Sequence, residues 1–139
     1  MKRGCGNMEF IHTNHSKFSS GHYCPAIIHD GIAYISGQLP INYDLKEKFP
    51  KGSLKDQVKQ ALSNLEAVLI QCGSSRKSVL KTTVYVSDID GWEEVNQTYA
   101  EFFGEHKPAR TIVPTAGLHF NSLIEIDAVA AVESEENKG

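Results

Sequence analysis

The chain has 139 residues and a mass of 15.4 kDa, with 40% hydrophobic residues, 22% charged residues and a formal net charge of −3. This composition is ordinary for a globular protein, and the acidic balance argues against a strongly basic nucleic-acid binder. No apolar run approaches the roughly 18 residues that a membrane-spanning helix needs. We expect one domain, residues 1–139, with a body over about residues 8–133 between polar tails at 1–7 and 134–139.

The cysteines and histidines indicate where the protein is located and whether it binds a metal. The three cysteines are Cys5, Cys24 and Cys72. Their odd number and the absence of a CxxC pair argue against a disulfide framework and favour a cytoplasmic location. The opening MKRGCGN has no apolar segment behind it, so we expect no secretory signal. Close to Cys24 lie three of the six histidines: His12, His15 and His22. Their spacing matches no zinc pattern, so a metal site there is only an alternative and we expect no metal.

Hydrophobic periodicity predicts strands interrupted by two helices. In chain order we expect strands at 9–13, 26–29 and 32–36, a helix at 54–72, a strand at 79–87, a helix at 91–103, and strands at 111–115 and 123–132. Asp30-Gly31, between the second and third strands, is typical of a type I′ hairpin turn. Pro114 confines the strand at 111–115 to a sheet edge or to an irregular conformation.

Both predicted helices have recognisable ends. Ser53 and Asp56 form a capping pair at the start of the helix at 54–72, and Gly73 ends it. Asp90 and Glu93 form a similar pair at the start of the helix at 91–103. The apolar stripe of this second helix comprises Trp92, Val95, Tyr99, Phe102 and Phe103. We interpret the stripe as core rather than as a platform for stacking nucleic-acid bases.

The order of the predicted elements is typical of an α+β fold with both helices on one face of a sheet. In the last strand, apolar residues alternate with Glu125 and Asp127 before both faces become apolar. The sheet face away from the helices is therefore partly apolar, and a subunit interface would cover it.

Two residues stand out chemically in a chain that has neither a P-loop nor a GxGxxG motif. Arg110 begins a strand with no acidic residue nearby in the sequence, which suits a bound carboxylate as well as it suits a surface ion pair. Glu125 lies within an apolar strand, where a carboxylate either faces solvent or transfers protons in a site. Asp127 on the same face favours the solvated alternative. The residues alone predict a small α+β domain with an Arg110 and Glu125 pair of interest.

Five segments, in a set order and spacing, carry a further resemblance. They are Tyr34-Ile35-Ser36-Gly37-Gln38-Leu39-Pro40, Thr82-Thr83-Val84-Tyr85, Val95-Asn96-Gln97-Thr98-Tyr99-Ala100-Glu101-Phe102-Phe103, Lys107-Pro108-Ala109-Arg110-Thr111 and Ile124-Glu125-Ile126-Asp127-Ala128-Val129-Ala130. Together they resemble the Rid (reactive intermediate deaminase) family, also known as the YjgF family. The resemblance covers about residues 9–133.

The resemblance implies a chorismate-mutase-like (YjgF-type) fold, a mixed sheet with two helices on one face. It implies a homotrimer with the sheets inside, the helices outside and a cleft between each pair of subunits. The implied activity is hydrolysis of reactive enamine or imine acids, such as 2-aminoacrylate and 2-aminocrotonate, to 2-keto acids and ammonia. Neither a cofactor nor a metal takes part.

Site residues follow from the same resemblance, position by position. Arg110 matches the arginine that binds the substrate carboxylate, and a bidentate guanidinium would orient the imine carbon. Glu125 matches the glutamate thought to position or activate the attacking water. Ser36 and Gly37 match the turn that lines the cleft, with the Gly37 N–H as a second carboxylate donor.

Three further positions border the implied cleft. Tyr23 matches an aromatic residue that closes the pocket, Asn96 matches a supporting position, and Ile112 replaces a residue that is often cysteine. Two loops depart from the family pattern. They read Gly21-His22-Tyr23-Cys24-Pro25 and Ala116-Gly117-Leu118-His119. These departures leave the preferred substrate open.

Two other functions remain as alternatives to the deaminase. One is a non-catalytic trimer that binds 2-keto acids or regulates a partner enzyme, in which Arg110 is an anchor and Glu125 is dispensable. The other is a ribonuclease or translation inhibitor. The acidic balance argues against the latter, and we expect neither a nucleic-acid nor a membrane partner.

Overall fold

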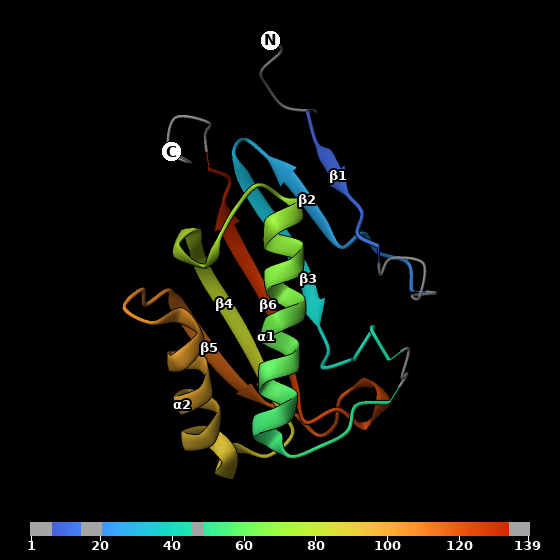
Figure 1. The fold of residues 1–139 in the computed structure, drawn as a ribbon, viewed down its shortest axis with the longest axis vertical. Coiled ribbons are helices and arrows are strands. Elements are labelled where there is room, and N and C mark those ends of the chain that lie inside the picture. The colour runs from blue at the N-terminus through green and yellow to red at the C-terminus, as the bar shows by residue number, and fades with distance from the viewer. Residues whose placement is uncertain (1–6, 15–20, 46–48, 134–139) are drawn as a thin grey trace.

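A computed structural model describes residues 7–14, 21–45 and 49–133 as a six-stranded sheet with two α-helices on one face (Figure 1). The strands are β1 (Glu9–Ile11), β2 (Ala26–His29), β3 (Ile32–Gln38), β4 (Val79–Val86), β5 (Ala109–Pro114) and β6 (Ile124–Ala131). The helices are α1 (Leu54–Gln71) and α2 (Trp92–Phe103), with short 3₁₀ turns η2 (Arg76–Ser78), η3 (Ile89–Gly91) and η4 (His119–Asn121). The predicted α+β class is confirmed.

The spatial order of the strands is β1-β2-β3-β6-β4-β5. Neighbouring strands are antiparallel except β4 and β5, which run parallel and are joined through α2. Asp30 and Gly31 both have positive φ, at 53° and 79°, which confirms the type I′ turn of the β2–β3 hairpin. β5 is an edge strand, as Pro114 predicts, and it begins at Ala109, two residues earlier than expected.

Helix α1 begins as its sequence predicts. The Ser53 hydroxyl accepts from the Asp56 N–H, and the Asp56 carboxylate accepts from the Ser53 N–H, which completes the capping box. Gly73, with φ of 73°, follows the last turn, where only a residue tolerant of the left-handed region is unstrained. The apolar stripe of α1 packs against β3 and β6, so this helix covers the centre of the sheet.

The predicted start of α2 is wrong in its details. Gly91 is the N-cap residue and provides no side-chain cap, so Asp90 and Glu93 do not form a capping pair. Instead the Asp88 carboxylate accepts from the Asp90 N–H and stabilises η3, which leads into the helix. Trp92 is 41% exposed rather than part of the core.

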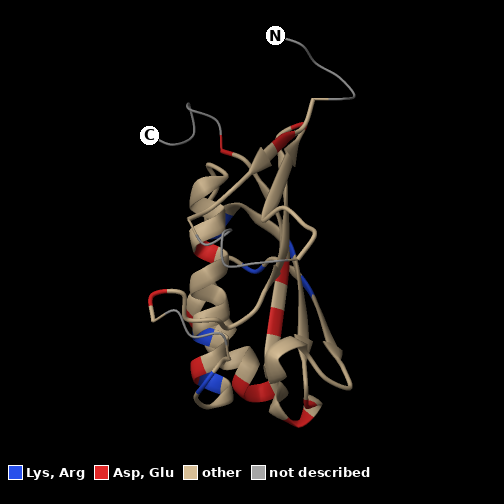
Figure 2. Ribbon diagram, turned by 90° about the vertical axis from the view of Figure 1, so that its right-hand side faces the viewer, with Lys and Arg blue, Asp and Glu red and all other residues tan. Residues whose placement is uncertain are grey.

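Helices cover one face of the sheet but not the other. In β6 every second residue from Ile124 to Ala130 is buried beneath the helices. On the other face no helix of the described residues covers the sheet, as the edge-on view shows (Figure 2). Tyr34, at 51% exposed, and Leu80, at 48%, are among the large apolar side chains on the surface.

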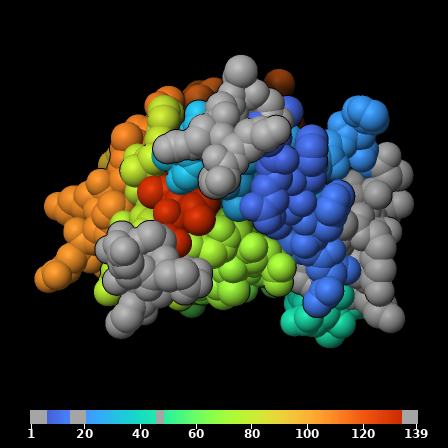
Figure 3. Space-filling view, turned by 90° about the horizontal axis from the view of Figure 1, so that it is seen from above, coloured from blue at the N-terminus to red at the C-terminus, as the bar shows by residue number. Residues whose placement is uncertain are grey.

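The view from above shows the blue strand β1 beside the yellow-green chain near the end of α1 (Figure 3).

Within the described residues, no helix is long and apolar enough to cross a membrane.

Candidate active site

Arg110 lies on edge strand β5, beside Thr82 of β4, and its side chain extends towards α2. Arg110 Nη1 donates to Asn96 Oδ1 at 2.9 Å. The guanidinium carbon lies 4.8 Å from the centroid of the Tyr99 ring and 5.6 Å from that of Trp92. One hydrogen bond and two aromatic faces therefore hold the cation.

The Tyr99 ring beneath Arg110 is itself fixed. Its hydroxyl pairs with Thr82 Oγ1 at 2.7 Å, and both residues are buried. Burial raises the pKa of the Tyr99 phenol, while the Thr82 hydrogen bond and the Arg110 charge act in the opposite direction. The phenol stays neutral at physiological pH and forms a rigid floor for the guanidinium.

A comparison with Arg76 shows what Arg110 lacks. Arg76 is paired with Glu66, through Nε–Oε2 at 2.6 Å and Nη2–Oε1 at 2.9 Å, and its third contact is the Phe102 carbonyl at 2.8 Å. Arg110 has no carboxylate partner within the described residues. Its remaining N–H donors suit a planar anion such as a carboxylate.

Glu125 lies near the start of β6, beside Tyr85 of β4, with its carboxylate over Gly37. A Cβ atom at position 37 would overlap Glu125 Oε2, so only glycine allows this close approach. The register between β3 and β6 shifts between Ile35 and Gln38, and the resulting bulge brings the Gly37 backbone under the carboxylate. Ser36 fixes the bulge, because its hydroxyl donates to the Cys24 carbonyl at 2.7 Å and its N–H to the Pro25 carbonyl at 3.0 Å.

The surroundings of Glu125 favour proton transfer. Burial raises the pKa of its carboxyl above the ordinary value, and the negative charge of Asp127 raises it further. His119 acts in the opposite direction. A carboxylate with a raised pKa is a better base than an exposed one, which suits it to accept a proton from water.

The structure does not bring Arg110 and Glu125 together within one chain. Arg110 contacts α2 and therefore lies on the helix-covered face. Glu125 lies between Ile124 and Ile126, which are fully buried beneath the helices, so its own side chain is on the opposite face. Of the predicted site residues, Arg110 and Asn96 form one group, and Ser36, Gly37 and Glu125 form another.

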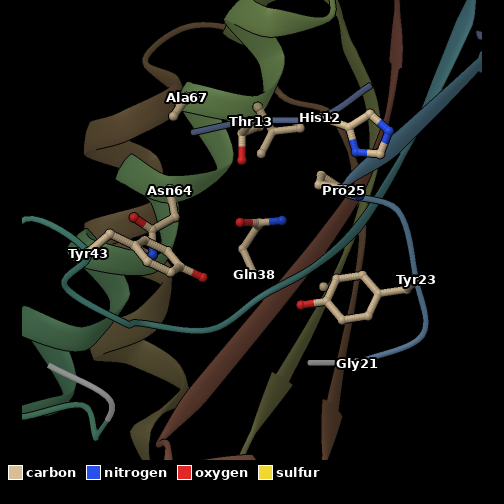
Figure 4. Close-up of a pocket in the computed structure, with 11 residues that line it drawn as sticks. His12, Thr13, Gly21, Tyr23, Pro25, Gln38, Tyr43, Asn64 and Ala67 are labelled. Carbon is tan, nitrogen blue, oxygen red and sulfur yellow. The ribbon is translucent and has the colours of Figure 1, made fainter. Parts of the chain in front are cut away.

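Tyr23 and Gly37 line a cavity of about 190 Å³ on the helix side of β3 (Figure 4). Gln38 projects into its middle, between Tyr43 and Tyr23. Tyr23 is 56% exposed, so within one chain it does not close a pocket over Glu125. Ile112 packs against the core on the helix side of β5.

The cysteines and histidines form no metal site in the part of the chain that the structure describes, where no group of three candidate ligands occurs. Cys5 and His15 lie outside the described residues. Cys24 Sγ contacts the Ile11 and Ala26 carbonyls at 3.2 and 3.3 Å and thereby connects β1 to β2. Burial raises the pKa of the Cys72 thiol to about 11, so this cysteine is an unreactive core residue.

Sequence reasoning placed Trp92 and Tyr99 in the core and did not connect them with Arg110. Their spacing contains a usable signal, because Trp92, Asn96 and Tyr99 follow one another at four and three residues and so share one face of α2. His119, whose charge acts to lower the pKa of Glu125, was noted only as a departure from a family pattern.

Comparison with known proteins identifies the family. A family model described as Endoribonuclease L-PSP matches residues 13–132. The chain belongs to the YjgF (Rid) family. A RutC family protein of Pyrococcus horikoshii is 41% identical over 125 residues, which cover 90% of this chain and 98% of that protein.

Solved structures of the YjgF family have the same fold. The Rid protein YyfA of Yersinia pestis superposes with a TM-score of 0.85 at 35% identity, covering 91% of this chain and all of that one. E. coli TdcF, crystallised with bound serine, superposes with a TM-score of 0.82 at 27% identity, covering 90% of this chain and 99% of that one. The resemblance in the five sequence segments is thereby confirmed at the level of family and fold.

Proposed function

We propose that this protein hydrolyses reactive enamine or imine acids, of the 2-aminoacrylate and 2-aminocrotonate type, to 2-keto acids and ammonia. The observation that carries the proposal is Arg110. It is a guanidinium pre-positioned by Asn96 and Tyr99 with no carboxylate partner among the described residues. A substrate carboxylate supplies the missing partner, and bidentate binding orients the carbon next to it.

Glu125 supplies the acid–base chemistry. Its carboxylate takes a proton from water as the water oxygen bonds to the imine carbon. It passes that proton to the imine nitrogen, which gives a carbinolamine. It then transfers the hydroxyl proton of the carbinolamine to the nitrogen as the carbonyl forms, the carbon–nitrogen bond breaks and ammonia leaves. The substrate is already an electrophile, so positioning and charge complementarity supply most of the rate. Nothing in this sequence of steps requires a cofactor or a metal.

The two groups act together only if different copies of the chain provide them. Arg110 is on edge strand β5, and the unpaired edge of this strand is open to a neighbouring copy. Glu125 is on the sheet face that no described helix covers, with exposed Tyr34 on the same strand as Gly37. A homotrimer with the sheets inside would cover this face and set Arg110 of one copy against Glu125 of the next.

The decisive experiment generates 2-aminoacrylate in place with a serine dehydratase and follows pyruvate formation with and without this protein. We expect acceleration by the wild type and none by Arg110→Ala. An Arg76→Ala variant is the matched control, because Arg76 already has its carboxylate partner in Glu66. Equal pyruvate rates with wild type, with Arg110→Ala and without protein would reject the deaminase.

A second candidate is a non-catalytic protein that binds 2-keto or amino acids. The relative TdcF holds serine in its crystal structure, so a member of the family binds a small amino acid. In that case Glu125→Ala would keep 2-keto acid affinity and the wild type would show no turnover. The endoribonuclease of the family description is less consistent with this site, because Glu125 and Asp127 share a face and repel an RNA phosphate backbone.

A further inference from the structure

The Arg76 ion pair shows how this protein holds a carboxylate on a stacked guanidinium. The Arg76 guanidinium carbon lies 4.1 Å from the centroid of the Phe102 ring. Its Nη1 donates to the Phe102 carbonyl at 2.8 Å, and its Nε and Nη2 donate to the two carboxylate oxygens of Glu66 at 2.6 and 2.9 Å. An aromatic ring on its face, one oxygen on Nη1 and a carboxylate on the Nε and Nη2 edge thus satisfy this arginine.

Arg110 repeats the first two of these three contacts. Its guanidinium carbon lies 4.8 Å from the Tyr99 ring centroid, and its Nη1 donates to Asn96 Oδ1 at 2.9 Å. Neither Nε nor Nη2 of Arg110 forms a hydrogen bond within the part of the chain that the structure describes. By comparison with Arg76, the Nε and Nη2 edge of Arg110 is therefore the edge that suits a bound carboxylate.

Trp92 provides Arg110 with a second aromatic ring. Trp92 and Tyr99 are seven residues apart on one face of α2, with Asn96 between them. Seven residues of α-helix rise by about 10.5 Å. Since the guanidinium carbon lies 5.6 Å from the Trp92 centroid and 4.8 Å from the Tyr99 centroid, the cation lies between the two rings.

The two rings differ in exposure. Tyr99 is 6% exposed and its hydroxyl pairs with buried Thr82, so the core closes the Tyr99 side of the guanidinium. Trp92 is 41% exposed, so the accessible side of the guanidinium is bounded by the indole. A bidentate carboxylate lies in the guanidinium plane, and the groups attached to it continue outwards from Arg110 on this accessible side. An exposed aromatic ring beside a few fixed polar donors is typical of a small-molecule site.

We propose that Trp92 is a specificity-determining residue: its ring packs against the side chain of an acid whose carboxylate Arg110 holds, so the site favours an aromatic side chain over an aliphatic one. For the enzyme, the favoured substrate class is an imine acid with an aromatic side chain, and this part rests on the proposed function. Selective binding of aromatic 2-keto acids does not depend on turnover.

Benzoylformate, pyruvate and trimethylpyruvate test the ring contact directly. All are 2-keto acids, but their side chains are a phenyl ring, a methyl group and a tert-butyl group. The chain has one tryptophan, so its indole N–H gives a single signal in a nitrogen-15 NMR spectrum. We expect saturating benzoylformate to shift this signal far more than either aliphatic acid does, because only the phenyl ring has a ring current. An equal shift with all three acids would overturn the contact.

Calorimetric titration measures the preference as a ratio of affinities. We expect the wild type to bind benzoylformate roughly 2- to 12-fold more tightly than trimethylpyruvate, the range that one aromatic pair gives. Trp92→Phe should keep most of this preference, and Trp92→Leu should lose it while still binding pyruvate. Phe49→Leu is the matched control, because Phe49 is a 60% exposed aromatic residue outside this site. A preference that survives in Trp92→Leu would overturn the proposal.

A second copy of the chain is the competing partner for the exposed indole. Light scattering of Trp92→Leu distinguishes the two. A mass equal to that of the wild type, together with loss of the benzoylformate preference, supports a ligand contact. A mass below that of the wild type would mean that a neighbouring copy packs on the ring, and it would overturn the proposal.

The outcomes separate this inference from the proposed function. Selective binding that depends on Trp92, in a protein without turnover, supports the inference and rejects the deaminase. Turnover of 2-aminoacrylate without any preference among the three keto acids overturns the inference and leaves the deaminase intact. A wild type that binds none of the three acids also overturns the inference. In an active protein, Trp92→Leu should lower kcat/KM more for the imine of phenylglycine, made in place by an amino acid oxidase, than for the imine of alanine.

Discussion

The Glu125 carboxylate lies directly against the backbone of Gly37, in space that a side chain at position 37 would occupy. A Cβ atom there would overlap Oε2 and lie 3.0 Å from Cδ of Glu125. The bulge in β3 and the absence of a side chain thus allow the base to lie directly against the backbone. This places a candidate N–H donor and a candidate proton acceptor within one small region.

Gly37→Ala should lower the turnover rate while leaving the stability of the fold almost unchanged. The added methyl pushes aside the end of a flexible side chain, so we expect little change in Tm but a loss of at least about tenfold in kcat, because the base is displaced. Gly117→Ala is the control, since a Cβ at Gly117 meets nothing within 4 Å and its φ is not in the left-handed region. Unchanged kcat in Gly37→Ala would argue against Glu125 as the base.

Arg110→Ala should strongly weaken the binding of 2-keto acids. The chain has one tryptophan, Trp92, and its ring lies 5.6 Å from the Arg110 guanidinium, so its fluorescence reports on this site. Loss of a charged hydrogen-bonding pair corresponds to about a 100-fold weaker affinity. Arg76→Ala should lower stability by only about 0.5–1 kcal/mol and leave the titration with pyruvate intact. Saturable pyruvate quenching in Arg110→Ala would place the anion elsewhere.

Local sequence signals predicted much of the fold. The stripe from Leu54 to Cys72 and the Ser53 capping box identify α1, and Asp30-Gly31 identifies the hairpin, because each depends on residues close together in the chain. The strand order was not predictable in this way. The insertion of β6 between β3 and β4 is a long-range pairing that no single segment encodes.

The identity of the candidate site residues was predictable from the sequence, but their arrangement on the sheet was not. Alternation places Glu125 opposite the buried face of β6, and the family resemblance singles out Arg110, yet neither reveals that they occupy opposite faces of one sheet. The left-handed conformation of Phe120 was also invisible, because phenylalanine is a poor candidate for such a position and tertiary contacts impose it.

Glu125→Gln should stabilise the protein at neutral pH while removing turnover. Burial raises the pKa of Glu125, so the folded state holds its proton more tightly than the unfolded state does. The stability this gives is present below the unfolded pKa of about 4.3 and is lost as pH rises through the folded pKa. Glu125→Gln should therefore have the higher Tm at pH 7, and the gap should close towards pH 4. The Tm of both proteins is measured from pH 4 to pH 8, and a constant gap for Glu125→Gln over this range would contradict the raised pKa.

Mixing two inactive variants should restore activity if sites form between copies. Arg110→Ala and Glu125→Ala each lack one group, and light scattering should give each a mass near three times 15.4 kDa. After subunit exchange, random assembly returns Arg110 of one copy and Glu125 of its neighbour to about one quarter of the sites, so about that fraction of wild-type activity should reappear. Arg110→Ala mixed with the double variant must stay inactive. Because Arg110 and Glu125 lie on opposite faces of the sheet within one chain, failure of recovery in hybrids verified by mass spectrometry would mean that the chain rearranges to bring its own two groups together, or that they do not share a site.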